Sequence, residues 1–103
     1  MLPSPIPIRL KNARNRAKLS QKELGIRAGI DENSASPRMN QYEKGKHAPD
    51  IDLLRRIAKE LEVPMSYFFC EDDTSAEIVR HLDQLSQKDK EDLLSQIINK
   101  AKN

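Results

Sequence analysis

Cysteine, histidine and glycine are all scarce in this chain of 103 residues. One cysteine excludes an internal disulfide, and together with two histidines it cannot supply the four ligands of a structural zinc site. Three glycines leave no glycine-rich phosphate loop, and no nucleophile stands at motif spacing from a general base. We therefore predict that the protein is not an enzyme, has no catalytic residues, and holds neither a metal nor a cofactor.

Long apolar runs are also missing. No segment approaches the roughly 18 consecutive apolar residues that a transmembrane helix needs. The first ten residues alternate proline with isoleucine, without the basic start and apolar block of a signal peptide. We expect a cytoplasmic protein with no membrane partner.

Charged residues are abundant and unevenly distributed. They make up 33% of the chain, whereas aromatic residues make up only 4%, and this mixture favours short packed helices. Residues 1–66 contain 13 Lys and Arg against 8 Asp and Glu, while residues 67–103 contain 5 against 8. A basic first part followed by an acidic second part suits a polyanion-binding domain with a separate extension.

Two helices are predicted before residue 30. The first should begin at about Pro7 or Ile8, because proline is tolerated in a first helical turn. Ser20 and Glu23 form a capping box, since the hydroxyl of one and the carboxylate of the other can each bond the partner's backbone N–H. The second helix should run from Gln21 to about residue 28, where Gly29 stops it.

A third helix follows a polar stretch. Pro37 would break a helix that began at Asp31, because it lacks the backbone N–H and crowds the preceding turn. With Ser34 or Ser36 as the N-cap, the proline falls in the first turn, where the missing N–H costs nothing. We therefore predict a polar turn and then a helix over about residues 35–44.

The remaining apolar residues predict four more helical segments. Asp50 can cap a helix over residues 51–61, and residues 65–69 supply a short fifth helix that completes a core. Thr74 opens a second capping box at the start of a sixth helix reaching about Leu85, and Ser86 caps a seventh. The seventh carries an apolar stripe: Leu93, Leu94, Ile97, Ile98 and Ala101.

The predicted fold is all-α. We expect a five-helix DNA-binding domain over residues 6–70 and a C-terminal pair of helices over residues 74–103. An apolar stripe beyond a finished core needs a partner surface, which could be the domain itself or a second subunit. We favour the second subunit, so the extension is predicted to form a homodimer.

The second and third helices predict double-stranded DNA as the ligand. Two helices joined by a glycine-containing turn can place the second one in a major groove. Arginine suits guanine, and asparagine or glutamine suits adenine, because each offers two groups in one plane. The candidate phosphate or base contacts are Ser34, Ser36, Arg38, Asn40 and Gln41.

An ordered set of short motifs resembles a known family. The motifs are Leu19 to Leu24 (Leu-Ser-Gln-Lys-Glu-Leu), Gly29-Ile30, Tyr42-Glu43-Lys44-Gly45-Lys46, Pro49, and Leu54 to Phe69. Together they are similar to the Cro/lambda-repressor (Xre-type) helix-turn-helix family over roughly residues 6–70. The resemblance implies a five-helix, lambda-repressor-like domain that binds operator DNA.

The resemblance also implies roles for individual residues. Gln21 opens the second helix against a phosphate and can bridge to the recognition helix, and Gln41 occupies a position that often touches a base edge. Lys44 and Lys46 lie where the family's loop grips the DNA backbone. A partly buried ion pair is implied between Arg14 and Glu43.

Two departures from the family pattern concern the same region. The stretch from Asp31 to Tyr42 has twelve residues where the family has about eight, an insertion of about one helical turn. Either the turn is longer or the recognition helix starts earlier. In addition, Gly25 stands where the family favours alanine, which costs about 1 kcal/mol of helix stability but preserves close helix approach.

Three functions are compatible with these features. A transcriptional repressor is favoured, with an antitoxin that represses its own operon as the runner-up. The antitoxin would use its C-terminal helices to hold a toxin partner, whereas the repressor would use them to dimerise. A protein–protein interaction module on the same fold is the third reading, and it predicts weak, sequence-indifferent DNA binding.

Overall fold

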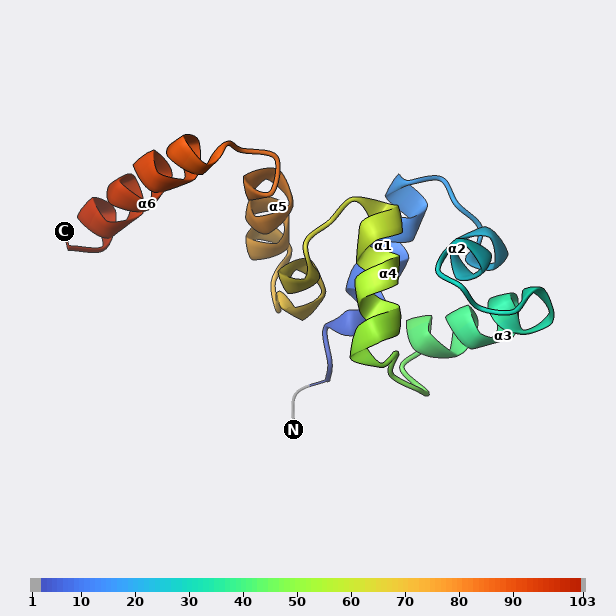
Figure 1. The fold of residues 1–103 in the computed structure, drawn as a ribbon. Helices are drawn as coiled ribbons and strands as arrows, with labels where there is room; N and C mark the ends of the chain where they lie inside the picture. Colours follow the sequence, from blue (N-terminus) through green and yellow to red (C-terminus); the bar gives the residue numbers. More distant parts are fainter. Residues whose placement is uncertain (1–2, 103) are drawn as a thin grey trace.

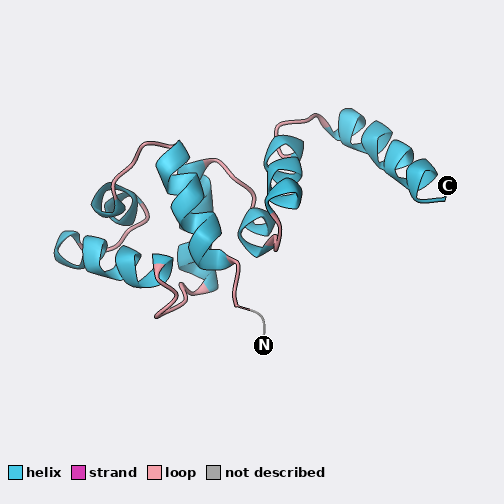
Figure 2. Cartoon of the chain, turned by 180° about the vertical axis from the view of Figure 1, so that it is seen from behind, coloured by secondary structure: helices cyan, strands magenta, loops and turns pink. Residues whose placement is uncertain are grey.

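The computed structural model describes residues 3–102, and every regular element in that range is helical (Figures 1 and 2). This confirms the predicted all-α fold. The elements are α1 (Ile6–Arg16), α2 (Gln21–Arg27), α3 (Glu32–Glu43), α4 (Ile51–Leu61), the 3-10 helix η1 (Met65–Phe69), α5 (Asp73–Leu82) and α6 (Gln87–Lys102).

Local capping chemistry determines where α2 begins and ends. The Ser20 hydroxyl accepts the backbone N–H of Glu23 at 3.0 Å, and the Glu23 carboxylate accepts the backbone N–H of Ser20 at 2.9 Å. These hydrogen bonds hold the pKa of Glu23 below its ordinary value. Gly29 follows the helix with a φ of +95°, a conformation that glycine adopts without strain. The predicted capping box and stop are both confirmed.

The predicted start of α3 is wrong. The helix begins at Glu32 rather than at about residue 35, and its N-cap is Asp31, whose carboxylate accepts the backbone N–H of Asn33 at 3.0 Å. Neither Ser34 nor Ser36 is the cap. Pro37 lies inside the helix, so the four residues that exceed the family pattern lengthen the third helix instead of enlarging the turn.

A close contact with α2 explains why α3 continues through Pro37. Proline in a helix interior costs about 3 kcal/mol, but the helical path from Glu32 buries Ala35 completely against α2. A Cβ atom built on Gly25 would lie only 2.8 Å from the Cβ of Ala35. The packing of these two helices therefore requires glycine at position 25 and outweighs the local preference of the proline.

The variant Gly25→Ala should destabilise the fold by about 1–3 kcal/mol, although alanine is the better helix former. The added methyl group would push α3 away, because the Ala35 Cβ is attached to the backbone and cannot swing aside. Urea unfolding measures the effect. The double variant Gly25→Ala/Ala35→Gly should recover only part of the lost stability, because the backbone atoms of residue 35 still lie within 3.2 Å and glycine weakens α3; a single variant as stable as the parent would show that the contact does not constrain the helices.

The core is a single cluster of buried side chains from α1, α2, α3, α4 and η1, joined by Ala76 of α5. Asp50 caps α4 as predicted, with its carboxylate accepting the backbone N–H of Leu53 at 2.8 Å. Tyr67 and Phe68 of η1 are fully buried and pack edge to face, with ring centroids 5.7 Å apart. The core therefore gains its largest side chains from the short fifth helix.

Helix α5 starts two residues earlier than predicted and has a different cap. Asp72, not Thr74, is its N-cap, because the Asp72 carboxylate accepts both the backbone N–H and the hydroxyl of Ser75 at 2.7 Å. The buried Arg9 of α1 anchors the same segment through a 2.8 Å ion pair with Asp73. Helix α5 is thus attached directly to the first five helices.

Helix α6 extends away from the other helices, on the side of the molecule opposite to α2 and α3 (Figures 1 and 2). None of its residues is buried. Of its apolar stripe, Leu94, Ile97 and Ile98 are 55%, 53% and 44% exposed. Across residues 3–102, no helix has both the length and the apolar character needed to cross a bilayer.

Candidate nucleic-acid interface

Helix α3 presents a polar face on the side opposite to the core. At 3.6 residues per turn, the buried Ala35, Met39 and Tyr42 share one face. The opposite face carries side chains that are exposed or half-buried: Asn33, Pro37, Asn40, Gln41 and Lys44. One side of α3 is therefore held by the domain while the other is available to a ligand.

An ion pair joins the end of α3 to α1. Arg14 donates from Nε to Glu43 Oε2 at 2.6 Å and from Nη2 to Glu43 Oε1 at 2.9 Å, so the contact is bidentate. The side chains are 13% and 4% exposed. Hydrogen bonding to Glu43 raises the pKa of Arg14, and Arg14 also donates to the carbonyl of Leu19. The pair implied by the family resemblance is present, and its role is to hold helices together.

Gln21 bridges α2 to α3. Its Nε2 donates to Asn40 Oδ1 at 3.3 Å and to Glu43 Oε1 at 3.2 Å. Both amide hydrogens of Gln21 are used in this way, so the side chain has no N–H left for a phosphate in this arrangement. Its backbone N–H, in the first turn of α2, has no intrahelical partner and is the better phosphate donor.

Asn40 and Arg38 are both engaged within the protein. The carbonyl oxygen of Asn40 accepts from Gln21, so the paired donor and acceptor that would read adenine are not both free. Arg38 donates from Nη2 to the hydroxyl of Tyr42 at 2.8 Å and lies over its ring, 5.9 Å from the centroid. Each side chain keeps free N–H donors, but only those donors can contact a base without a change of partner.

Gln41 and Asn33 are exposed, and among residues 3–102 no side-chain hydrogen bond involves either amide. Gln41 was a predicted base contact. Asn33 was missed, because the third helix was predicted to begin after it. The sequence does indicate a helix that includes Asn33, because Asp31, two residues earlier, is a good N-cap. Pro37 argued against a helix that begins there.

The two serines occupy different positions on α3. Ser36 is exposed at the edge of the polar face, and Ser34 is half-buried in the first turn. A 3.7 Å ion pair between Lys22 of α2 and Glu32 of α3 lies at the same end. The structure therefore brings the start of α2 and the start of α3 to one region of the surface.

Lys44 and Lys46 lie in and just after the last turn of α3. Gly45 between them has a φ of +74°, and the backbone N–H of Lys46 returns to the carbonyl of Gln41 at 3.0 Å. Both lysine side chains are exposed. This tight turn places two cations next to the polar face of α3.

In the part of the chain that the structure describes, no three His, Cys, Asp or Glu side chains lie close enough together to bind a metal ion. The chemistry that the polar face of α3 can perform is recognition by hydrogen bonds and positive charge.

Comparisons with known proteins agree on one family. The family model described as helix-turn-helix matches residues 10–68. The HTH-type transcriptional regulator ImmR of Bacillus subtilis (strain 168) is 31% identical over 93 residues, which cover 90% of this chain and 61% of ImmR. The chain therefore spans less than two thirds of the length of this relative.

A solved structure extends the similarity to nearly the whole chain. The crystal structure of the transcriptional regulator BswR matches with a TM-score of 0.82 and 42% identity. The match covers 91% of this chain and 93% of the BswR chain.

Proposed function

Since the chain belongs to the Xre/Cro-type helix-turn-helix family of DNA-binding transcriptional regulators, we propose that it is a sequence-specific, homodimeric repressor that acts in the cytoplasm. Proteins of this family bind DNA and are not enzymes. The proposal assigns residues 6–70 to DNA binding and residues 74–103 to dimerisation.

The polar face of α3 is the observation that carries this proposal. The opposite face of α3 is buried in the core, and the Arg14–Glu43 pair holds the C-terminal end of the helix. The helix can therefore enter a major groove as a rigid body. Gln41 has both amide groups available for a base edge, and Asn33 extends the same face toward the helix start. Lys44 and Lys46 supply charge for the adjacent phosphates.

The remaining predicted contacts have secondary roles in the proposal. The backbone N–H of Gln21 faces a phosphate, while its side chain positions Asn40. Arg38 contacts the DNA with the N–H groups that Tyr42 does not use, and Ser34 and Ser36 contact the phosphates nearest the start of α3.

The exposed stripe of α6 supports dimerisation. Three large apolar side chains lie on one face of α6, and no residue of this helix is buried by the rest of the chain. A second copy of α6 would cover this face and leave the polar face of α3, at the other end of the molecule, free for DNA (Figure 1).

An antitoxin is the second candidate function, and the same stripe is the observation that favours it. In that role α6 would hold a toxin, and the chain alone would be a monomer. The third reading, an interaction module, predicts that DNA binding is weak and indifferent to sequence.

Selection of bound duplexes from a random pool, followed by affinity measurements, tests the proposal. Gln41→Ala should relax sequence preference at one base pair of each half-site, with a loss of about 1–3 kcal/mol for the preferred sequence only. Lys46→Ala should weaken binding to all sequences and make the affinity less dependent on salt.

Lys11→Ala is the matched control, because Lys11 is an exposed cation of α1 outside this surface. It should leave both sequence preference and salt dependence unchanged. Equal affinity of the parent protein for selected and random duplexes would rule out the repressor and favour the interaction module.

A further inference from the structure

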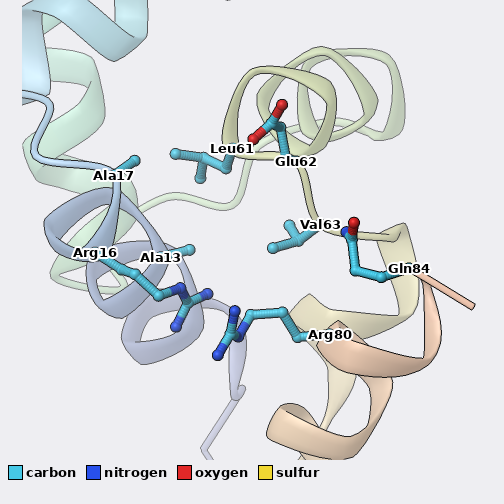
Figure 3. A pocket seen from close by; sticks show the side chains of 8 residues that line it. All are labelled: Ala13, Arg16, Ala17, Leu61, Glu62, Val63, Arg80 and Gln84. Carbon is cyan, nitrogen blue, oxygen red and sulfur yellow. The ribbon is translucent and has the colours of Figure 1, made fainter.

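A cleft of about 320 Å³ lies apart from the polar face of α3, where α1, the end of α4 and α5 meet (Figure 3). Ala13 and Ala17 line it from α1, and Leu61 and Val63 line it from the end of α4 and the residues that follow. Its volume is at the lower end of the range of small-molecule sites, roughly 300–1,000 Å³.

Two arginines point toward each other in this cleft. Arg16 comes from α1 and Arg80 from α5, and Figure 3 shows their guanidinium groups facing one another. Arg16 lies over the buried ring of Tyr67, 5.5 Å from the centroid. Two hydrogen bonds to the Glu77 carboxylate, at 3.1 and 2.8 Å, hold Arg80 in place. Both cations are therefore positioned before any ligand binds.

Most of the N–H groups of this arginine pair have no acceptor. The guanidinium of Arg16 takes part in no hydrogen bond among residues 3–102, and its Nη1 stands 3.8 Å from Glu77 Oε2, too far for one. Arg80 uses only Nε and Nη2. A guanidinium carries five N–H donors, so Arg16 in full and Nη1 of Arg80 are available to an incoming acceptor.

The nearby carboxylates do not cancel this donor surface. Glu77 is already shared with Arg80, and that hydrogen bonding holds its pKa below the ordinary value. Glu62 lines the opposite rim, and in Figure 3 its carboxylate points away from the two guanidinium groups. An anion between the arginines would therefore face N–H donors on one side, and on the other the exposed Ala17 and the narrow exposed edges of core residues such as Leu61.

We propose that this cleft binds a small organic carboxylate, whose charged group lies between Arg16 and Arg80 and whose apolar part lies against the exposed side chain of Ala17. A planar carboxylate matches the planar donor edge of a guanidinium. The bound carboxylate joins α1 to α5, and so sets the position of the C-terminal helices relative to the DNA-binding helices. This last consequence rests on the proposed function, whereas the binding itself does not.

Hexanoate is a suitable probe, because it combines a carboxylate with a short apolar chain. Titrated into the full chain without DNA, it should shift the Nε–Hε NMR signals of Arg16 and Arg80 saturably, with a Kd of about 1 mM. Hexanol, which lacks the charge, and inorganic phosphate, which lacks the chain, should each bind at least about tenfold more weakly.

The variants Arg16→Gln and Arg80→Gln should each weaken hexanoate binding at least about tenfold, and Lys11→Gln should not. Circular dichroism establishes that the variants are folded. Absence of saturation by hexanoate, or equal binding to Arg16→Gln and the parent, would overturn the site. Phosphate that binds as tightly as hexanoate would overturn the ligand class.

The effect on DNA is measured separately. Saturating hexanoate should change the affinity for a two-half-site duplex by at least about threefold, and should not do so in Arg16→Gln. Saturable binding with no change in DNA affinity would overturn the regulatory role. Failure of the protein to bind any selected duplex would instead overturn the proposed function and leave the carboxylate site standing.

Discussion

Glu43→Ala should destabilise the protein by about 3–5 kcal/mol, a large share of the roughly 5–15 kcal/mol that stabilises a small domain. The Glu43 carboxylate accepts two hydrogen bonds from Arg14 of α1 and one from Gln21 of α2, and its side chain is only 4% exposed. Its removal leaves the largely buried Arg14 charge without its counter-ion. Urea unfolding followed by circular dichroism gives the free energy of unfolding.

Glu77→Ala is the matched control for this change. Glu77 also forms a bidentate pair with an arginine, Arg80, but the pair is open to solvent. Exposed pairs contribute under about 1 kcal/mol, so this variant should unfold at nearly the same urea concentration as the parent. If both variants lost the same stability, the burial of the Arg14–Glu43 pair would not be what makes it important.

Leu94→Lys/Ile97→Lys should convert the proposed dimer into a monomer and lower the affinity for a two-half-site operator about 100-fold. Both side chains are more than half exposed within one chain, so lysine there does not disturb the fold of the monomer. In the proposed dimer they meet a second α6, where two lysines per chain would have to lose their hydration. Sedimentation equilibrium measures the mass, and fluorescence anisotropy the affinity.

Gln96→Lys/Asn99→Lys adds the same charge to exposed positions outside the apolar stripe of α6. This control should keep the mass and the operator affinity of the parent. A parent protein that is already monomeric at micromolar concentration would contradict the dimer. It would favour the antitoxin, in which the apolar stripe stays exposed until a toxin binds.

The parts of the fold that could be predicted from the sequence are those that local chemistry decides. Ser20, Asp50 and Gly29 determine helix ends through bonds and dihedral angles within a few residues, and all three act as predicted. Asp72 and Thr74 illustrate the limit of this approach. Both are good caps, and Asp72 is the cap because α5 begins two residues earlier, at Asp73, which pairs with the buried Arg9.

The start of α3 could not be predicted from local rules. The cost of Pro37 is visible in the sequence, whereas the gain from packing Ala35 on Gly25 appears only when α2 and α3 are placed together. Within the candidate site, the Arg14–Glu43 pair followed from the family resemblance. The bonds of Gln21 to Asn40 and of Arg38 to Tyr42 depend on side-chain conformations that spacing does not determine.

In the proposed DNA complex, the early start of α3 increases the length of DNA that one chain can cover. Four residues at 1.5 Å per residue lengthen the helix by about 6 Å at its N-terminal end, a distance that corresponds to nearly two stacked base pairs. The extra turn carries Asn33 at the leading end of the helix and Glu32 beside Lys22. A half-site of this protein should therefore be longer than that of a relative with the shorter helix, and its added positions should depend on Asn33.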